Sequence, residues 1–338
     1  MLEVKQIKYK VLEILSDGKF HSGENLGQAL GISRAAVWKQ LQKLESMGLQ
    51  LESVKGKGYR LPDGFELLNE KEIIGYLTPS VERQLQALKI HQSLDSTNRV
   101  ATDEIQQRQA DKASATGTII MSEYQSNGRG RRGKDWISPF ASNIYLSIIW
   151  DFYNGASALQ GLSLSIGVAV RRALTELGVD AVSLKWPNDI YVNDKKLGGI
   201  LLEMVGDPAG QCTVIIGIGI NVSMPSKSGQ VIDQQWTDIR SCTHKPVSRN
   251  QLVALVIESC FKMLVDYEEK GFANYRDEWQ ASDAFKGKQG TIISANQSIT
   301  GIILGVDNIG ALKMRLSNGE VTHFIGGELS LRANDSND

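Results

Sequence analysis

The order of hydrophobic and polar positions divides the chain into three stretches. Near the N-terminus, apolar residues recur every three or four positions, which predicts short amphipathic helices. Beyond residue 66, short apolar runs typical of buried strands alternate with longer helical patterns. From about Phe285, short strands follow one another between glycines and Asn-containing turns. A chain of 338 residues exceeds what one core usually holds, so we expect domains at 1–62, 66–282 and 285–332.

The N-terminal stretch predicts a winged helix-turn-helix. Three helices precede a hairpin with a basic tip, and the third helix, which Ser33 caps, has the position of a DNA-reading helix. A helical packing domain with ordinary surface lysines is the alternative. The expected elements are helices from Val4 to Leu15, Gly23 to Leu30 and Ser33 to about Met47, and strands from Leu49 to Val54 and Tyr59 to Leu61.

Charge favours the DNA-binding interpretation. Residues 1–62 contain ten Lys and Arg against six Asp and Glu, a net charge of +4, whereas the rest of the chain has 27 against 32, a net charge of −5. Only the N-terminal domain therefore suits a polyanion. The candidate DNA contacts are Ser22, Ser33, Arg34, Lys39, Gln40, Lys43, Lys55 and Lys57.

The central stretch, after the break at Pro62-Asp63-Gly64, predicts an α+β domain with a mixed sheet and flanking helices. The C-terminal stretch predicts a small β-barrel. Central helices are expected at Glu66 to Leu77, Arg99 to Arg108, Ala158 to Gly178 and Ser248 to about Glu269. Central strands are expected at Leu88 to His91, Thr118 to Glu123, Asn143 to Trp150, Val182 to Trp186, Asp189 to Val192, Lys196 to Val205 and Thr213 to Val222.

The most distinctive chemistry lies in the basic loop, Gly128 to Lys134, which holds three glycines and four cations. Such a loop brings backbone N–H and guanidinium groups close to phosphate or carboxylate oxygens. A solvated loop or a nucleic-acid-binding Arg/Gly segment is the alternative. Three later runs place polar groups and glycines at strand ends, which favours one composite pocket. They are Lys185-Trp186-Pro187-Asn188-Asp189, Lys195-Lys196-Leu197-Gly198-Gly199 and Gly217-Ile218-Gly219-Ile220-Asn221.

These four runs, in this order and spacing, resemble those of the biotin–protein ligases. With the N-terminal domain, the chain is similar over essentially its whole length to the bacterial biotin–protein ligases that also repress the biotin operon. The resemblance implies a class II synthetase-like central sheet and an SH3-like C-terminal barrel. It implies that ATP and Mg²⁺ activate biotin to biotinyl-5′-adenylate, and that biotin passes to a lysine of a biotin carboxyl carrier protein. It further implies repression by an adenylate-bound homodimer on operator DNA.

The resemblance also assigns roles to residues. Lys196 is the leading catalytic candidate, with Arg131 and Asp189, although by itself Lys196 suits a solvated hairpin lysine and Asp189 a structural carboxylate. Ser96 is otherwise a plain helix cap, and Trp136 either stacks on adenine or packs in the core. The biotin-binding candidates are Ser96, Thr97, Asn98, Gln125, Arg129, Gly130, Arg131, Lys196 and Gly199. The nucleotide-binding candidates are Arg131, Arg132, Trp136, Asn188 and Asn221.

Composition argues against other classes of protein. No apolar run approaches the ~20 residues that a membrane span needs, and no signal-peptide pattern is present. Cys212, Cys242 and Cys260 lack metal-ligand spacing, so we expect a reducing cytoplasm and no protein-held metal. Two other functions stay open: a transcription factor that only binds biotin or its adenylate, and a ligase for lipoate or another acyl acid. The arginine-rich loop and the later Lys-Trp-Pro-Asn-Asp run favour biotin.

Overall fold

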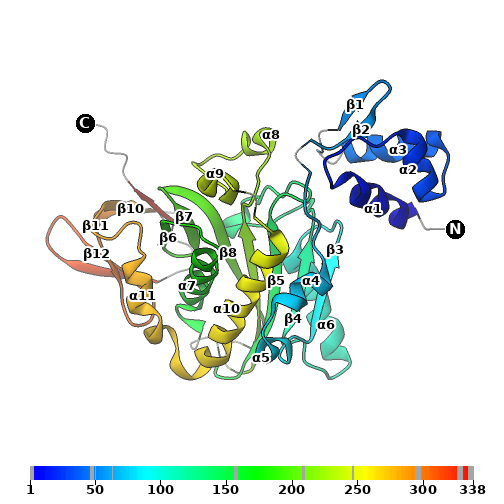
Figure 1. Cartoon of the computed structure of the whole chain (residues 1–338). Coiled ribbons are helices and arrows are strands. Elements are labelled where there is room, and N and C mark those ends of the chain that lie inside the picture. Colours follow the sequence, from blue (N-terminus) through cyan, green and yellow to red (C-terminus); the bar gives the residue numbers. More distant parts are fainter. Residues whose placement is uncertain are drawn as a thin grey trace, which may run out of the picture.

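The computed structural model contains three β-sheets, which belong to an N-terminal winged unit, a central unit and a C-terminal unit (Figure 1). The structure describes residues 4–45, 49, 51–62, 64–155, 159–207, 210–245, 247–293, 298–325 and 330–333. Three positions used in the predictions lie outside these ranges: Met47, where the third helix was predicted to end, Ala158, where a central helix was predicted to start, and Asp63 of the linker. Within them, none of the helices is long and apolar enough to cross a membrane.

The N-terminal unit confirms the predicted winged helix-turn-helix. Ser22 caps the second helix by accepting the N–H of Asn25 at 3.0 Å, and Gly31 ends that helix in the left-handed conformation. Val37 and Leu41 of the third helix are buried against the other two. The elements are α1 (Val4–Leu15), α2 (Gly23–Leu30), α3 (Arg34–Glu45), β1 (Glu52–Val54) and β2 (Gly58–Arg60).

The linker differs from the helix predicted to start at Glu66. Residues 66–69 are not helical, and α4 (Glu70–Tyr76) starts after Asn69, whose side chain accepts the N–H of Glu72 at 3.2 Å. A separate short helix, α5 (Pro79–Glu82), follows. The prediction is wrong for residues 66–69 because partners far along the chain bind their polar groups, as shown below.

The central sheet has seven strands in the order β3-β4-β5-β9-β8-β7-β6. It is the predicted mixed sheet, since β3 and β4 are parallel and the other neighbours are antiparallel. The strands are β3 (Ala87–His91), β4 (Thr118–Ser122), β5 (Ile144–Phe152), β6 (Val182–Lys185), β7 (Asp189–Val192), β8 (Lys195–Gly206) and β9 (Cys212–Ile220).

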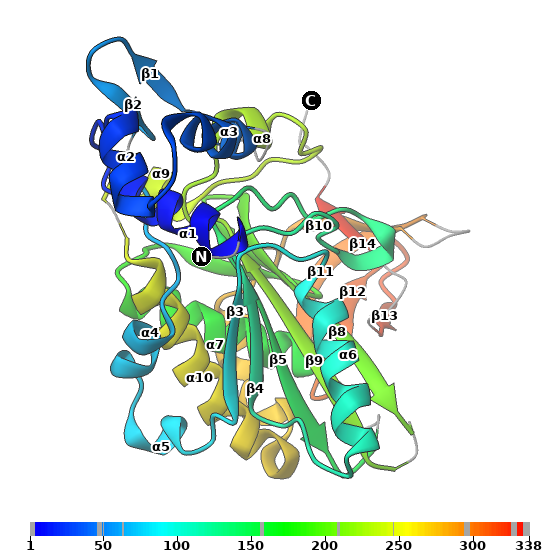
Figure 2. The same cartoon turned by 90° about the vertical axis from the view of Figure 1, so that its right-hand side faces the viewer.

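Helices cover both faces of this sheet (Figure 2). On β4, Ile119 and Met121 belong to one core and Ile120 to another, as alternation along a strand requires. The larger core packs under α7 and α10, and the smaller one under α6. Burial on both faces explains the continuous apolar runs. The remaining elements are α6 (Thr97–Ala110), η1 (Arg131–Gly133), α7 (Leu162–Glu176), α8 (Ser226–Gly229), α9 (Ile239–Thr243), α10 (Arg249–Lys270), η3 (Phe272–Asn274) and α11 (Arg276–Ala281).

The C-terminal unit is an antiparallel sheet in the order β13-β12-β11-β10-β14. Within the described residues its outer strands do not pair with each other, so the predicted closed barrel is not confirmed. Short strands between glycines predict hairpins, but closure depends on strand tilt and stagger, which no local pattern records. The strands are β10 (Gln289–Ile293), β11 (Ser298–Val306), β12 (Leu312–Arg315), β13 (Val321–Phe324) and β14 (Ser330–Ala333).

The segment that leads into the C-terminal unit, and the unit itself, contact the central sheet. The backbone N–H of Leu184 in β6 donates to Ser282 O at 2.7 Å, and the backbone carbonyl of Leu184 accepts the N–H of Ala284 at 2.9 Å. Trp186 donates its indole N–H to Gly310 O at 3.0 Å. The C-terminal sheet is therefore held beside the strands that carry the Lys185 to Asp189 run.

Candidate functional site

One cavity lies where the ends of β6 to β9 meet the start of α6 and the basic loop. Its volume is about 1640 Å³, larger than the ~300–1,000 Å³ usual for a single small ligand. It therefore has room for two ligands side by side. All the ligand-binding and catalytic candidates line it: Ser96, Thr97, Asn98, Gln125, Arg129, Gly130, Arg131, Arg132, Trp136, Asn188, Asp189, Lys196, Gly199 and Asn221.

The start of α6 presents hydroxyl and amide groups to the cavity. Ser96 occupies the N-cap position but makes no side-chain cap hydrogen bond, which argues against the plain-cap alternative. Gln125 Oε1 accepts two hydrogen bonds from Thr97, one from the backbone N–H at 2.8 Å and one from the side-chain hydroxyl at 3.2 Å. Ser147 Oγ lies 2.8 Å from Thr97 Oγ1 and donates to Asn98 Oδ1 at 2.6 Å. These bonds fix several donors and acceptors in one place, as recognition of a small polar ring requires.

Two glycines of β9 make room for the cavity's own side chains. A Cβ at Gly217 would lie 2.4 Å from Asn98 Oδ1, and one at Gly219 would lie 2.6 Å from the Trp136 ring. Both distances are shorter than real Cβ contacts. These glycines are thus required by Asn98 and Trp136 before any ligand binds.

Lys196 forms a half-buried ion pair with Asp189. Its Nζ lies 2.8 Å from Asp189 Oδ1, with both side chains 15% exposed, and 5.6 Å from the centre of the Trp136 ring. The neighbouring Lys195 is exposed, so the structure separates the two lysines that the sequence places together. Burial lowers the pKa of nearby Arg131, yet a guanidinium stays charged at neutral pH.

The basic loop is held to the central sheet by polar partners. It contains the single turn η1. Arg129 pairs with Glu203 of β8 through two N···O contacts of 3.1 Å. Arg131 donates to Asn188 Oδ1 at 3.1 Å. The cations of the loop therefore line the cavity.

Two buried polar atoms of the cavity wall have no hydrogen-bond partner among the residues that the structure describes. They are Trp136 Nε1 and Asn221 Oδ1. The amide group of Asn221 donates to Thr237 O at 3.1 Å, which fixes the direction of the unpaired oxygen. Unsatisfied buried groups cost free energy, so a ligand that supplies an acceptor and a donor here gains stability. Trp136 lies between Gly219 of β9 and the cavity, so its ring both packs on the strand and faces the cavity.

The winged unit exposes most of the candidate DNA contacts on α3 and on the hairpin tip. Ser22 and Ser33 accept backbone N–H groups at the starts of α2 and α3. Lys57 at the tip also lies 5.9 Å from the centre of the Phe20 ring. The exposed cations are Arg34, Lys39, Lys43, Lys55 and Lys57.

Gln40 does not belong to this exposed face. Its side chain is 8% exposed, with Oε1 buried, because it lies on the side of α3 that carries Val37 and Leu44. The structure therefore does not support Gln40 as a DNA contact. Trp38 of the same helix is 50% exposed.

Protein-family models match the three units in order. They are an HTH domain at residues 8–60, the biotin/lipoate A/B protein ligase family at 90–221 and a biotin protein ligase C-terminal domain at 287–332. The bifunctional ligase/repressor BirA of Escherichia coli K12 is 38% identical over 327 residues, which cover 97% of this chain and 98% of that protein. The chain belongs to the bifunctional biotin ligase/repressors. BirA of Bacillus subtilis is 30% identical over 316 residues, covering 93% of this chain and 95% of its own.

Solved structures extend the likeness to three dimensions. The biotin protein ligase of Aquifex aeolicus in complex with biotin and ATP is 27% identical, with a TM-score of 0.61. The match covers 74% of this chain and 100% of the Aquifex aeolicus chain. This ligase/repressor therefore has the biotin ligase fold, with a winged helix-turn-helix at its N-terminus.

Some residues that line the cavity of the ligase/repressor lie outside the recognised runs. They come from the segment before α9 and from the C-terminal unit: Val231, Trp236, Phe285 and Lys288. Val231 is 69% exposed although its neighbours are mostly polar. An apolar residue within a mostly polar segment is the feature of the sequence that would have identified this segment as part of the cavity wall.

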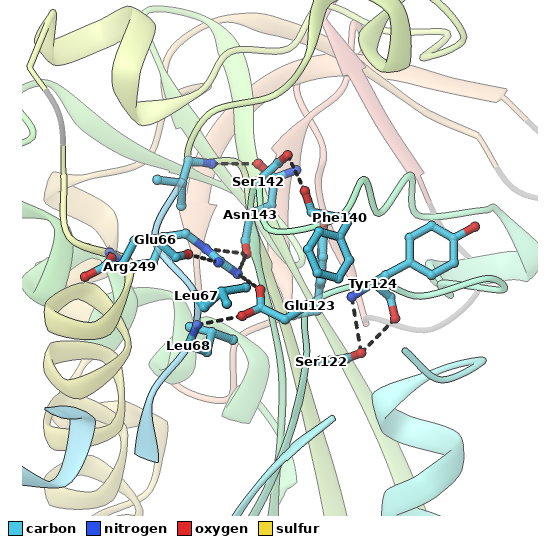
Figure 3. A network of polar contacts seen from close by, with 12 residues as sticks. Glu66, Leu67, Leu68, Ser122, Glu123, Tyr124, Phe140, Ser142, Asn143 and Arg249 are labelled. Atoms are coloured by element: carbon cyan, nitrogen blue, oxygen red, sulfur yellow. Dashed lines mark hydrogen bonds and ion pairs between the residues drawn. The ribbon is translucent and has the colours of Figure 1, made fainter. Parts of the chain in front are cut away.

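A buried clamp of Glu66, Leu68, Glu123, Asn143 and Arg249 holds the linker of the ligase/repressor (Figure 3). Arg249 pairs with Glu123 at 2.7 Å, with the side chains 4% and 2% exposed. Arg249 also donates to Glu66 O at 2.6 Å and to Asn143 O at 2.8 Å. Glu123 accepts the Leu68 N–H at 2.6 Å. The linker is thus fixed by groups from β4, α10 and the start of β5.

The clamp adjoins two segments of the ligase/repressor that carry candidate ligand-binding residues. Glu123 lies two residues before Gln125. Asn143 Oδ1 accepts the N–H of Val222, the residue after Asn221, at 2.9 Å. The segments that carry Gln125 and Asn221 are therefore anchored by the same group of side chains that holds the linker.

Proposed function

We propose that this chain forms biotinyl-5′-adenylate from biotin and ATP and transfers the biotin to a specific lysine of a biotin carboxyl carrier protein. As an adenylate-bound homodimer it represses biotin synthesis genes. The observation that carries this proposal is that one cavity collects all the ligand-binding and catalytic candidates. The chain that forms this cavity is similar over its length to bifunctional ligase/repressors. A relative of the same fold contains biotin and ATP.

In the first step, a biotin carboxylate oxygen bonds to the α-phosphorus of ATP while the bond to the pyrophosphate oxygen breaks. Both reactants are anionic, so the approach needs fixed positive charge. Lys196 and Arg131 supply it from the cavity wall. The ion pair with Asp189 holds the Lys196 Nζ in its half-buried place until the carboxylate of biotin competes for it.

In the second step, the amine of the acceptor lysine attacks the carbonyl carbon, and AMP leaves with the electron pair of the broken C–O bond. Before the attack the ammonium form of the lysine gives one proton to water, and the nitrogen gives a second proton to water as the amide bond forms. Asp189 is the carboxylate beside the reacting groups, so it holds and orients that ammonium. Arg131 and Arg132 stabilise the charge on the departing phosphate.

Within the cavity, the start of α6 suits the ureido ring of biotin, because its fixed groups include both donors and acceptors. Asn221 Oδ1 suits the amino group of adenine, since it is an unpaired acceptor. Mg²⁺ is usually held by one or two carboxylates and by substrate phosphates. Among the described residues no cluster of three acidic, His or Cys groups exists, so Mg²⁺ would come with ATP beside Asp189 and Asn188. Biotin also contacts Ser96, Thr97, Asn98, Gln125, Arg129, Gly130 and Gly199, and the nucleotide contacts Trp136.

Regulation rests on the winged unit, whose exposed cations suit DNA phosphates. A symmetric dimer would present two α3 helices to a palindromic site. We assign residues 1–62 to the DNA-binding domain, 66–282 to the catalytic domain and 285–332 to an SH3-like domain. The ligase/repressor works in the cytoplasm, where its carrier protein and operator are found.

The decisive experiment incubates the protein with ATP, Mg²⁺ and either biotin or lipoate, and identifies the adenylate by mass spectrometry. Biotinyl-adenylate supports the proposal, whereas lipoyl-adenylate alone assigns the chain to the lipoate ligases. Biotin-dependent exchange of labelled pyrophosphate into ATP separates an enzyme from a protein that only senses biotin. Its absence would contradict the catalytic assignment.

A further inference from the structure

A large apolar side chain, Trp38, lies on the exposed side of α3, the third helix of the winged unit. Trp38 is 50% exposed, whereas Val37 and Leu41 of the same helix are buried in the core of that unit. Exposure recurs on successive turns, so the exposed residues form one face of the helix. They are Arg34, Ala35, Trp38, Lys39, Gln42 and Lys43.

Uncharged residues occupy the middle of this face, and charged residues border it. With about 3.6 residues per turn, Trp38 and Gln42 follow Arg34 around the helix in steps of roughly 40°. Beyond them come Ala35, then Lys39 and finally Lys43. The face therefore runs from one cation, across an aromatic ring, an amide and a methyl group, to two further cations.

This order fits a helix in the major groove of DNA. Such a helix has base edges in front of the middle of its exposed face and phosphates at its two sides. Arg34 and Lys43 at the borders suit phosphates. Trp38 has no charge to offer a phosphate, but an apolar side chain recognises the C5-methyl group of thymine, which only the major groove displays.

Gln42 completes the pattern. A glutamine amide forms two hydrogen bonds with N6 and N7 of adenine. Gln42 follows Trp38 by about one helical turn of ~5.4 Å, which is less than two base-pair steps of ~3.4 Å. The two side chains can therefore contact neighbouring base pairs.

We propose that Trp38 is a specificity-determining residue of this ligase/repressor. It contacts the methyl group of a thymine in the major groove, and Gln42 binds an adenine within two base pairs of that thymine. The inference rests on the repressor function proposed above and adds which bases α3 recognises. Gln42 thus takes the place of the buried Gln40 as the amide that contacts DNA.

The test uses the full-length protein with biotin, ATP and Mg²⁺, and a fluorescein-labelled duplex that the wild type has selected from a random-sequence pool. Anisotropy gives a specificity ratio, the affinity for this duplex divided by that for an unrelated duplex of equal length. In Trp38→Ala the ratio should fall at least about fivefold, as for one mismatched base pair. Affinity for the unrelated duplex and its salt slope should stay at wild-type values, because no charge is lost. A wild-type ratio, or an equal loss of affinity for both duplexes, would overturn the proposal.

Replacing thymine by uracil isolates the methyl group, since uracil lacks only that group. At the contacted thymine the replacement should weaken wild-type binding about fourfold, the effect of one buried methyl group. It should weaken binding of Trp38→Ala less than about twofold, because the partner is already absent. Trp38→Phe keeps an aromatic ring and should stay sensitive to it. If uracil costs the wild type and Trp38→Ala the same affinity at every thymine, Trp38 does not contact a methyl group.

The base analogue 7-deazaadenine, which lacks the N7 acceptor, tests Gln42 in the same way. It should weaken binding of the wild type at the contacted adenine and leave binding of Gln42→Ala unchanged. An equal loss in both proteins at every adenine would remove Gln42 from the proposal.

Tyr76→Ala is the matched control, because Tyr76 is an aromatic residue of α4 that is 56% exposed and lies outside the winged unit. It should leave the specificity ratio and the effect of uracil unchanged. All variants should form biotinyl-adenylate at the wild-type rate, which shows that they fold. If the wild type selects no sequence, the repressor function fails together with this inference. If it selects one and Trp38→Ala keeps the wild-type ratio, only the inference fails.

Discussion

At the scale of single residues, Asn98 decides the shape of the cavity wall. It accepts a hydrogen bond from Ser147, donates one to Glu203 and fills the space beside Gly217. Resemblance located Asn98 and the glycines of β9 in one pocket. It did not reveal that they touch, because α6 and β9 are far apart in sequence and no local pattern records a contact between them. Glu203 was missed for the same reason.

Gly217→Ala tests this contact. The added Cβ would lie 2.4 Å from Asn98 Oδ1, so the amide must move and we expect KM for biotin to rise at least about tenfold. Pyrophosphate-exchange kinetics at varied biotin concentration measure the effect. Gly75→Ala is the matched control, since a Cβ there meets nothing within 4 Å. An unchanged KM in Gly217→Ala would remove Asn98 from the biotin site.

Lys196→Ala should keep the fold but lose ~2–4 kcal/mol of transition-state stabilisation, because a fixed charge at the reacting oxygens is removed. This corresponds to a fall of roughly 30- to 900-fold in kcat/KM for adenylate formation. Lys195→Ala serves as control, since its side chain is exposed beside the same hairpin. A rate within tenfold of the wild type would reject Lys196 as catalytic.

At the scale of elements, hydrophobic periodicity located the central strands and long helices because each pattern follows from burial of the element's own side chains. It was wrong at residues 66–69, where the polar groups of Glu66 and Leu68 have partners in Arg249 and Glu123. The winged unit also depends on a distant residue: Phe140 lies in the same apolar cluster as the helices α1 to α3. Its ring packs edge-on to Phe65 with centroids 6.2 Å apart.

Arg249→Met should destabilise the protein by ~3–5 kcal/mol, since it leaves the carboxylate of Glu123 buried without its ion-pair partner. Urea unfolding measures the loss. Arg172→Met removes an arginine whose pair with Glu278 is 49% and 31% exposed, and it should cost less than ~1 kcal/mol. Equal stability of the two variants would show that the clamp contributes nothing beyond a surface pair.

Asp283, at the junction of the central and C-terminal sheets, predicts a pH dependence. Burial raises the pKa of its carboxyl from 3.8 to about 6. The folded chain therefore holds this proton more tightly than the unfolded chain, and stability falls as pH rises from about 4 to 6. The cost above pH 6 is at most ~3 kcal/mol.

Asp283→Asn should remove that cost, because asparagine is neutral and keeps an oxygen for the Phe285 N–H, now 2.9 Å from Oδ1. The variant should be more stable than the wild type at pH 8 and similar to it near pH 4, by thermal unfolding at both pH values. Asp277→Asn, whose parent side chain is 84% exposed, should show no such difference. The same gain at both pH values would exclude titration of Asp283 as the cause.

Across the whole molecule, charge separates two tasks. The positive N-terminal unit suits DNA, and the cavity of the central unit concentrates its cations on substrate anions. Composition and the order of the elements were sufficient to predict the three units, whereas both activities were predicted from the family resemblance that the motifs carry. Whether the C-terminal sheet closes into a barrel could not be predicted from the sequence, because closure depends on geometry over the whole unit.

Lys55→Ala and Lys57→Ala should each weaken binding to any DNA sequence and lower the salt slope of binding by about one, as loss of one phosphate contact does. Fluorescence anisotropy over a range of salt concentrations measures the slope. Lys262→Ala, which removes a side chain of α10 that is 62% exposed, should leave the slope unchanged. A wild-type slope in both wing variants would show that the hairpin does not touch the backbone, and adenylate formation should be normal in all three.

The clamp also sets an order of events during synthesis on the ribosome. Glu66 and Arg249 are 183 positions apart, a distance that translation at ~5–20 residues per second covers in roughly 10–40 seconds. The helices and wing of the N-terminal unit are complete long before that. A newly made winged unit therefore spends this interval on a linker that has not met its partners, and only the emergence of α10 fixes where the reader helix lies relative to the cavity.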